Sequence, residues 1–590
     1  RLMEGGGVGA NYSTKYVSKY EITKALRVHI VCDPEHADYE LLNNSGLLSK
    51  HYDAEWPGSF EVEDSREGWG SSLVDLLNAY EDETTMHEDR VFDLSRLRRK
   101  GARIKGFGGT ASGPAALATM LIEISDVLND SVKSDSGRLT ALRAMEIDHA
   151  IASAVVAGGT RRSARMSMVH WADPNVFEFI TCKQDTGKHW TTNISVEIDD
   201  EFVSLVRRAK VPKAQQQRKD LAGAVLDACI VGMLTNGEPG FWNHDLSNHG
   251  EPEEVICTNP CGEIALREFE NCNLGHVNLD AFYDDIQGAH EAHRLMARFL
   301  VRATFGDVND PKQKAVLAEQ RRIGLGHFGF QGWLVKQGIR YSDSHRNNFV
   351  RKTLSNFKKT VRIEARAYAF QLRIPEPVKV TTVAPTGTIA KMPGRTEGAH
   401  AIYSRYFIRR VRFNKSSLQG RQSIAAFELE GLLTEIDLYD ASGNTVVVSF
   451  PTKELLVEEV ESLGLDAETL VESQDEISLT DLLEVQAMYQ THFADNAVSF
   501  TVNLKAEAHQ EEALANGEDL LPPTKSRVEY VKESLVSVLP LLKGTTMMVD
   551  GTRPQAPYER ITQEEYDTMI GGSVDTSYDE ECASGACPVR

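Results

Sequence analysis

The sequence predicts an α/β fold, and three observations support this. Strand-like runs, Gly-rich loops and helical stretches follow one another repeatedly along the chain, an order typical of α/β proteins. The composition is that of a globular protein, with 41% hydrophobic and 25% charged residues. The length of 590 residues exceeds what one hydrophobic core usually organises, so we expect one large elaborated domain or two to three domains.

Local patterns predict the elements of the first part of the chain. Residues 27–31 are an apolar run typical of a strand, and residues 71–80 have helical spacing. Residues 101–114 indicate a strand that runs into a Gly-rich loop. We expect long apolar helices over residues 115–128 and 139–157.

The later part alternates in the same way. Residues 290–305 and 346–371 have the spacing of amphipathic helices, and the apolar run 378–383 indicates a strand. Residues 451–520 contain 17 Asp or Glu against two Lys, which favours a solvated helical surface. An acidic loop is expected over residues 509–523.

Charge and hydropathy exclude several functions. The formal net charge of −22 argues against general nucleic-acid binding, because phosphate contacts need Lys and Arg. The mean hydropathy is −0.33, and no run of about 18 apolar residues predicts a membrane-spanning helix. No signal peptide is visible, so we expect a cytoplasmic protein. Because the chain starts at Arg1, immediately before a Gly-rich element, we expect it to be a fragment.

The strongest chemical feature is an Asn-Pro-Cys-Gly-Glu sequence that runs from Asn259 to Glu263. Pro260 fixes its φ angle and Gly262 permits unusual backbone angles, so we expect a tight loop with Cys261 at its tip. Asn259 supplies a hydrogen-bond donor and an acceptor, and Glu263 supplies a proton acceptor. These groups could form a compact reactive site, or an ordinary turn before a strand.

Eight cysteines are too few for a disulfide-built scaffold in a chain of this length. We interpret three as small buried hydrophobic residues: Cys32, Cys182 and Cys229. Three others fall within sixteen positions: Cys257, Cys261 and Cys272. The interpretation as small buried hydrophobic residues fits this second group less well.

The last two cysteines, Cys582 and Cys587, lie in a polar, small-residue tail that we expect to be mobile. Two thiols on such a tether can close a disulfide and reach into a cleft, since thiolate exchange requires access. A zinc site would need further ligands near by, and the tail has none.

A Gly/Thr loop after the predicted strand at residues 378–383 indicates a phosphate site. Strand, loop and helix start together offer backbone N–H groups and hydroxyls to an anion. A short Gly/Thr turn without a ligand is the alternative. The loop residues are Pro385, Thr386, Gly387 and Thr388. The arginines of residues 403–412 indicate either paired surface charge on a strand or further anion contacts.

Together these motifs resemble the adenosylcobalamin-dependent (class II) ribonucleotide reductases, and most of all the single-chain ribonucleoside-triphosphate reductases. The resemblance runs over essentially the whole chain, and the order and spacing of the motifs make it specific. Further segments that carry it are residues 5–9, 64–69, 104–114, 158–164, 404–412, 494–499 and 553–559.

The resemblance implies a ten-stranded α/β barrel of two five-stranded halves with a central finger loop, here lacking its N-terminal part. On this basis residues 1–420 form the catalytic barrel core, with the finger loop near residues 257–272. Residues 421–574 add C-terminal barrel elements and an acidic helical elaboration. Residues 575–590 form a mobile redox tail.

The resemblance also implies the reduction of ribonucleoside triphosphates to 2′-deoxyribonucleotides for DNA synthesis, with adenosylcobalamin (coenzyme B12) as cofactor. Cys261 becomes a thiyl radical that removes the 3′-hydrogen, Glu263 is the acid/base at the 3′-hydroxyl, and Asn259 orients the substrate hydroxyls. Cys272 belongs to the cysteine pair that reduces the substrate. We expect a buried, water-poor loop to shield the radical.

The implied partners are a dNTP or ATP effector and thioredoxin or a similar dithiol, which would re-reduce the enzyme through Cys582 and Cys587. Thr386 and Thr388 would hold the substrate phosphates. The family's first redox cysteine precedes the Gly-rich element at which this chain starts. We therefore expect an N-terminal segment to be missing and the chain alone to be inactive.

Two alternatives remain open. The first is an inactive nucleotide-binding or regulatory subunit with the same fold. The second is a thiol hydrolase, which would need a histidine such as His276 to activate Cys261. The base-off cobalamin pattern fails after Asp343 and His345, because Arg-Asn-Asn follows.

Overall fold

The chain folds into two compact units. Unit 1 comprises Arg1–Glu197 and Cys257–Pro260, and unit 2 comprises Ile198–Ile256 and Cys261–Arg590. The computed structural model describes residues 2–4, 6–22, 24–52, 58–81, 88–104, 110–134, 137–156, 164–184, 188–415, 418–438, 445–504, 526–549 and 555–570.

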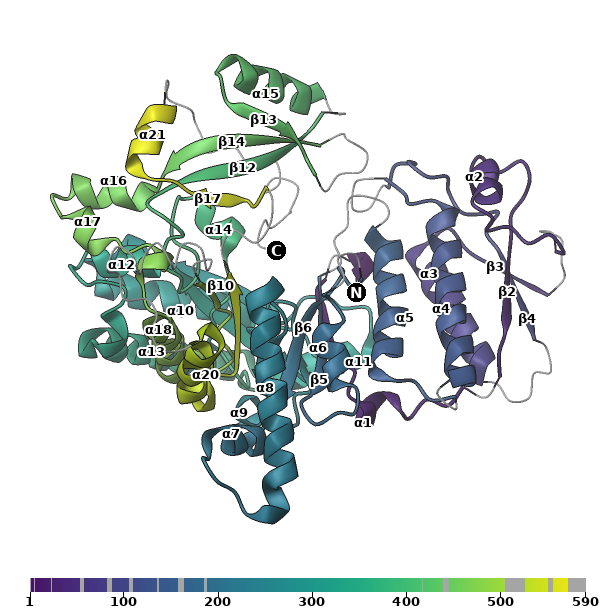
Figure 1. Ribbon diagram of the computed structural model, residues 1–590, viewed down its shortest axis with the longest axis horizontal. Helices are drawn as coiled ribbons and strands as arrows, with labels where there is room; N and C mark the ends of the chain where they lie inside the picture. Colours follow the sequence, from purple (N-terminus) through teal and green to yellow (C-terminus); the bar gives the residue numbers. More distant parts are fainter. Residues whose placement is uncertain are drawn as a thin grey trace. The chain divides into compact units, whose positions relative to one another are not determined.

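Unit 1 alternates strands and helices (Figure 1). Its strands are β1 (Val8–Asn11), β2 (Arg27–Val31), β3 (Ser59–Glu61), β4 (Asp89–Asp93), β5 (Arg165–His170), β6 (Asn193–Ile198) and β8 (Cys257–Thr258). Its helices are α1 (Thr14–Val17), α2 (Tyr39–Asn44), α3 (Arg66–Glu81), α4 (Pro114–Ser134), α5 (Ala141–Val156) and α6 (Val176–Thr181), with a 3-10 turn at Leu2–Glu4.

A three-stranded parallel sheet, in the order β2-β4-β3, is covered by α4, with α3 and α5 beside that helix (Figure 1). Helix α4 forms because its apolar residues recur every three or four positions and share one face. These residues are Leu117, Leu121, Ile124 and Leu128, and all are buried. Burial of this apolar face stabilises the packed helix by about 25 cal/mol per Å² of apolar surface removed from water.

A second parallel arrangement, in the order β1-β5-β6, supports residues 257–260. Strand β5 is buried along almost its whole length, as expected for a parallel strand covered on both faces. Its register places Val8 opposite Arg165, and Met166 opposite Asn193. These strands carry side chains that contact residues 257–260.

Unit 2 is larger and contains the remaining elements. Its helices are α7 (Asp200–Arg207), α8 (Gln216–Asn236), α9 (His244–Asn248), α10 (Ile286–Ala303), α11 (Pro311–Gln320), α12 (Phe330–Val335), α13 (Asn348–Leu372), α14 (Gly387–Lys391), α15 (Leu418–Leu429), α16 (Leu455–Ser462), α17 (Ala467–Leu470), α18 (Leu479–His492), α20 (Arg527–Val538) and α21 (Gln563–Met569). Its strands are β7 (Gly240–Asn243), β9 (Ala265–Leu266), β10 (Asn273–Asn278), β11 (Ile323–Phe328), β12 (Tyr406–Asn414), β13 (Leu433–Ile436), β14 (Thr445–Lys453), β15 (Thr501–Leu504), β16 (Gly544–Val549) and β17 (Tyr558–Arg560). Short 3-10 turns lie at Lys213–Gln215, Leu279–Phe282, Ser344–Arg346, Gln474–Glu476 and Leu539–Leu541.

Strands β10 and β11 are parallel, with Asn273 opposite Ile323, and helices α10 and α13 pack against each other beside them. The strand predicted at residues 378–383 is present only as isolated bridges, from Thr381 to Leu325 and from Val383 to Val498. Strands β15 and β16 are also parallel, and β16 pairs antiparallel with β7.

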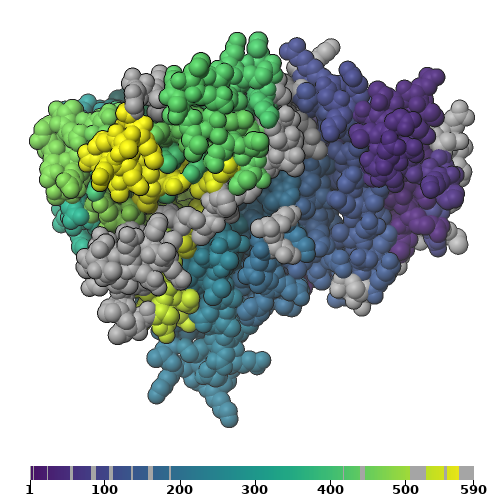
Figure 2. Space-filling view, turned by 45° about the horizontal axis from the view of Figure 1, so that its top comes forward, coloured from purple at the N-terminus to yellow at the C-terminus, as the bar shows by residue number. Residues whose placement is uncertain are grey.

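An antiparallel sheet in the order β13-β14-β12-β17 carries the arginine-rich segment. Figure 2 shows the yellow C-terminal segment against this green sheet, where the Tyr406 and Tyr566 rings lie 5.2 Å apart. Arg412 pairs with Asp437 at 3.0 Å, and Arg410 pairs with Glu559. These pairs favour structural strand charge over further anion contacts.

The predicted helices at 71–80, 115–128, 139–157, 290–305 and 346–371 are confirmed as α3, α4, α5, α10 and α13, and the strand at 27–31 is β2. None of the helices in the described part of the chain is long and apolar enough to cross a membrane. The α/β class is confirmed, and the ten-stranded barrel stays a prediction.

The expectation of a solvated helical surface over residues 451–520 is wrong for α18. Leu482, Val485 and Tyr489 are buried, because this helix packs between α13 and α20. Counting acidic residues over a long stretch of sequence does not reveal the apolar face of a single helix within it.

Candidate active site

The segment with Cys261 forms the predicted tight loop between β8 and β9. Gly262 has a φ of +81°, which a residue with a side chain rarely adopts. Pro260 and Glu263 are buried, whereas Cys261 is exposed. The expectation of a water-poor surrounding is therefore wrong for this thiol, since its neighbours take the buried positions.

The base of the loop fits tightly against the Gly-rich strand β1 in unit 1. A β carbon on Gly9 would lie 1.9 Å from the Thr258 carbonyl oxygen and 2.8 Å from the Cys257 Sγ. A β carbon on Gly7 would lie 2.6 Å from the Pro260 Cγ. The glycines therefore permit a close backbone approach, a role that the sequence motif did not reveal.

Asn193, the first residue of β6, also contacts the loop. Its Nδ2 donates a hydrogen bond to the Pro260 carbonyl oxygen at 2.9 Å. The Thr258 hydroxyl donates to the Asn259 carbonyl oxygen, also at 2.9 Å, and Asn259 is partly buried. No sequence signal singled out Asn193, because it lies 66 positions before Asn259.

The Glu263 end of the loop is held within unit 2. Its carbonyl oxygen accepts hydrogen bonds from the Thr382 hydroxyl at 2.9 Å and the Ala497 N–H at 2.8 Å. The Glu263 side chain is only 2% exposed. The structure thus links the motif to two segments far away in sequence, around residues 378–383 and 494–499.

Cys272 lies immediately before β10 and is partly exposed. Burial raises the pKa of its thiol; the Glu270 and Glu263 carboxylates raise it further, whereas the Arg322 guanidinium lowers it. Cys272 is therefore a protonated thiol at neutral pH. Because Glu263 influences its titration, these two predicted site residues share one electrostatic environment.

A buried ion cluster flanks Cys272. The Arg322 Nε lies 2.7 Å from a Glu270 carboxylate oxygen, and its two Nη atoms lie 2.9 and 2.7 Å from the Glu251 oxygens. Lys379 pairs with the same Glu251 at 2.8 Å. Arg322 directly precedes β11 and Glu270 lies two residues before Cys272, so the cluster fixes the starts of both strands.

The predicted phosphate loop leads directly into α14, which begins at Gly387. Thr386 is left-handed, with a φ of +59°, and its Oγ1 accepts a hydrogen bond from the Gly398 N–H at 2.8 Å. Lys391 ends the helix, pairs with Glu397 at 3.4 Å and hydrogen-bonds Tyr558. The expected helix start is confirmed, and a lysine that sequence reasoning missed lies one helical turn beyond the loop.

The cysteines differ in their surroundings. Cys32 and Cys229 are free and buried, which confirms them as small core residues, and burial raises the pKa of Cys32 to about 11. Cys182 is only partly buried. Cys582 and Cys587 lie outside the described residues, as do residues 105–109 and 157–163.

The structure shows the surroundings of two histidines that the sequence singled out, His345 and His276. The Nε2 of His345 lies 2.9 Å from an Asp481 oxygen, so this ring is committed to a carboxylate. Burial lowers the pKa of His276 to about 4, and within the described residues its Nε2 has no hydrogen-bond partner. Among the described residues, His276 Nε2 is therefore not hydrogen-bonded to Cys261, so no contact at this nitrogen supports the thiol hydrolase.

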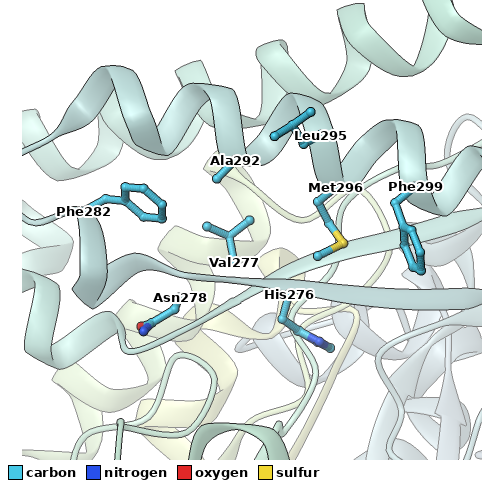
Figure 3. Close-up of a pocket in the computed structure, with 8 residues that line it drawn as sticks. All are labelled: His276, Val277, Asn278, Phe282, Ala292, Leu295, Met296 and Phe299. Atoms are coloured by element: carbon cyan, nitrogen blue, oxygen red, sulfur yellow. The ribbon is translucent and has the colours of Figure 1, made fainter. Parts of the chain in front are cut away.

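A cavity of about 350 Å³ lies between β10 and α10 (Figure 3). Figure 3 shows Val277 pointing toward the helix, whereas His276 and Asn278 point to the other side of the strand. The helix contributes apolar side chains: Ala292, Leu295, Met296 and Phe299. This apolar cavity lacks Cys261 and Glu263 and is separate from the reactive loop.

An exposed thiol two residues from a buried carboxylate, on a loop of an α/β scaffold, is the arrangement that a thiol-dependent enzyme uses. Comparison with known families agrees. Residues 210–361 and 378–517 match the family "Ribonucleotide reductase, barrel domain". Residues 26–128 match "B12-dependent ribonucleotide reductase, insertion domain", which corresponds to the β2-β4-β3 sheet with α2, α3 and most of α4.

Similar proteins point to the same family. One is a protein of Mycobacterium phage D29 named as an adenosylcobalamin-dependent ribonucleoside-triphosphate reductase; it is 50% identical over all of this chain and 84% of its own length. The enzyme of that name from Lactobacillus delbrueckii subsp. bulgaricus is 30% identical over all of this chain and 79% of its own length. A crystal structure of a B12-dependent (class II) ribonucleotide reductase superimposes with a TM-score of 0.75 and 28% identity, over 96% of this chain and 75% of that one. The chain belongs to the adenosylcobalamin-dependent (class II) ribonucleotide reductases.

Proposed function

We propose that this chain reduces ribonucleoside triphosphates to 2′-deoxyribonucleotides with adenosylcobalamin, for DNA precursor synthesis. The observation that carries the proposal is the loop itself, with an exposed Cys261 two residues from a buried Glu263. Family membership and the substrate class named for the relatives support it.

The chemistry that bound adenosylcobalamin supplies is removal of a hydrogen atom from a cysteine thiol. Cys261 fits this requirement because its side chain is exposed and therefore accessible. Its thiyl radical then takes the 3′-hydrogen of the ribose. Glu263 accepts and returns the proton of the 3′-hydroxyl, and Asn259 orients the substrate hydroxyls.

The 2′-hydroxyl leaves as water, and a cysteine pair supplies two electrons and two protons as it becomes a disulfide. Cys272 is one member of this pair, and its high thiol pKa keeps the proton available for transfer. The 3′-hydrogen returns from Cys261 to the product. Cys582 and Cys587 re-reduce the pair and exchange with thioredoxin or a similar dithiol.

The phosphates of the substrate lie at Pro385, Thr386, Gly387 and Thr388, where hydroxyls and backbone N–H groups are available. Lys391 adds positive charge one helical turn away. A dNTP or ATP effector binds separately, and the enzyme is cytoplasmic.

The fold that we propose around this site is a ten-stranded α/β barrel of two five-stranded halves. The core comprises residues 1–420, residues 421–574 are the C-terminal elaboration, and residues 575–590 are the redox tail. The three parallel strands β1, β5 and β6 and the parallel pair of β10 and β11 support this arrangement.

The test is turnover of a ribonucleoside triphosphate with adenosylcobalamin and a dithiol under anaerobic conditions, by protein that includes any N-terminal segment. The proposal predicts a 2′-deoxyribonucleotide product that disappears in Cys261→Ser. Effector binding without turnover, by protein that includes any N-terminal segment, would instead indicate a regulatory subunit.

A further inference from the structure

Asn193 has a direct contact with the peptide bond that precedes the reactive cysteine. The residue is exposed and begins β6, and its Nδ2–H donates to the Pro260 carbonyl oxygen at 2.9 Å. An amide nitrogen is a donor and a carbonyl oxygen an acceptor, so the direction of this bond is fixed.

The Pro260 carbonyl belongs to the planar peptide group that includes the Cys261 nitrogen. The proline ring fixes φ of Pro260, and a hydrogen bond to its carbonyl restricts ψ. The backbone after Cys261 is less restrained, because Gly262 follows and glycine is conformationally free. The direction in which the thiol leaves the loop thus depends strongly on the Pro260 carbonyl.

The support on which Asn193 sits is rigid. Asn193 pairs in register with Met166 of β5. The preceding residue, Thr192, is buried; its hydroxyl lies 2.8 Å from that of Ser167, and its carbonyl accepts a hydrogen bond from the Lys183 Nζ at 2.6 Å. A side chain on such a base can hold a loop with little motion of its own.

We propose that Asn193 is a positioning residue that sets the orientation of the Cys261 thiol through the Pro260 carbonyl. The proposal rests on the role of Cys261 in the proposed function. Because the Asn193 side chain is exposed, its loss affects the position of the loop far more than the stability of the fold.

The test compares Asn193→Ala and the isosteric Asn193→Asp, which removes the donor, with Glu178→Gln, an exposed control in the same unit. For each holoenzyme variant, kcat, KM and the thermal midpoint are measured. The alkylation rates of Cys261 and Cys272 by iodoacetamide are measured by mass spectrometry in protein without cofactor.

We expect kcat to fall roughly tenfold to a hundredfold in both Asn193 variants, the size of effect that a small misplacement produces. KM and the thermal midpoint should change little. In Asn193→Ala, Cys261 should be alkylated severalfold faster, because the loop is released, while Cys272 is unaffected. Glu178→Gln should resemble the wild type.

Wild-type kcat and wild-type labelling of Cys261 in both Asn193 variants would overturn the proposal. It would also be overturned by a lower thermal midpoint together with faster labelling of both cysteines, since that indicates general loosening. Full turnover in Cys261→Ser would refute the proposed function, whereas the labelling rates would still decide whether Asn193 holds the loop.

Discussion

The α carbon of Gly9 lies so close to the Thr258 carbonyl oxygen that a β carbon on Gly9 would come within 1.9 Å of it. Real β carbons essentially never approach another atom closer than 3.0 Å, and a carbonyl oxygen of the backbone cannot rotate away. Strand β1 and the base of the reactive loop therefore fit only if this residue has no side chain.

Gly9→Ala should displace residues 257–260 and lower activity. Overpacking at such a contact costs about 1–3 kcal/mol of folding free energy, and the displaced loop should reduce kcat further. Denaturation midpoints and kcat check this. Gly70→Ala is the control: it lies in α3 with open space around it, and alanine there should stabilise by about 0.5–1 kcal/mol. Equal effects of the two substitutions would contradict the prediction.

Arg322→Met should be strongly destabilising, because it leaves the carboxylate of Glu270 buried without its cation and that of Glu251 with Lys379 alone. Breaking one partner of a buried ion cluster costs about 3–5 kcal/mol. The double variant Arg322→Met with Glu270→Gln should recover part of this loss. Denaturant unfolding measures the stability of the single and the double variant.

The matched control for Arg322 is Arg218→Ala, which breaks the more exposed pair with Glu201 at 2.9 Å. A surface pair contributes about 0.2–1 kcal/mol, so this variant should unfold close to the wild type. A loss in Arg322→Met as small as that in Arg218→Ala would refute the role of the cluster.

The protein should lose stability as the pH falls from about 6.5 toward 4, because of buried histidines in unit 2. Ala289 accepts a hydrogen bond from His293 Nδ1–H at 2.6 Å, so His293 Nε2 must accept from His327 Nε2–H at 2.7 Å. Burial lowers the pKa of His293 to about 4 and that of His327 well below its usual value.

The unfolded chain binds these protons near pH 6.5, before the folded protein does, so acid favours unfolding. Each histidine contributes up to about 1.4 kcal/mol per pH unit in this window. In His293→Gln the unfolding midpoint should depend less steeply on pH than in the wild type, whereas the exposed His51→Gln should match the wild type. An unchanged slope in His293→Gln would contradict this assignment.

Glu263→Gln should reduce kcat by about 10²–10⁴-fold, the usual contribution of a general acid/base, with a smaller effect on KM. Gln keeps the size of the side chain and leaves the bonds to the Glu263 carbonyl in place. Steady-state kinetics, with Cys261 alkylation as a check on loop position, measure this. A wild-type kcat would exclude the acid/base role.

The sequence predicted local features well because their causes are local. The α4 helix follows from the spacing of Leu117, Leu121 and Ile124, and the turn at Cys261 follows from the flanking Pro and Gly. The positive φ of Gly262 is the angle that such a motif favours.

Contacts across the chain could not be predicted in this way. Asn193 reaches Pro260 only because β6 lies beside β5 in the sheet, and Thr382 reaches Glu263 only through the tertiary fold. The exposure of Cys261 likewise depends on which neighbours are buried. Neither periodicity nor composition contains this information.

Rapid-freeze EPR can detect the thiyl radical that the proposed function assigns to Cys261. Holoenzyme with adenosylcobalamin, a ribonucleoside triphosphate and an effector is frozen within milliseconds, with normal cysteine or cysteine deuterated at the β carbon. A thiyl radical on Cys261 should give a signal that changes shape on deuteration, persists in Cys272→Ser and disappears in Cys261→Ser. A signal that survives in Cys261→Ser, or that deuteration leaves unchanged, would contradict it.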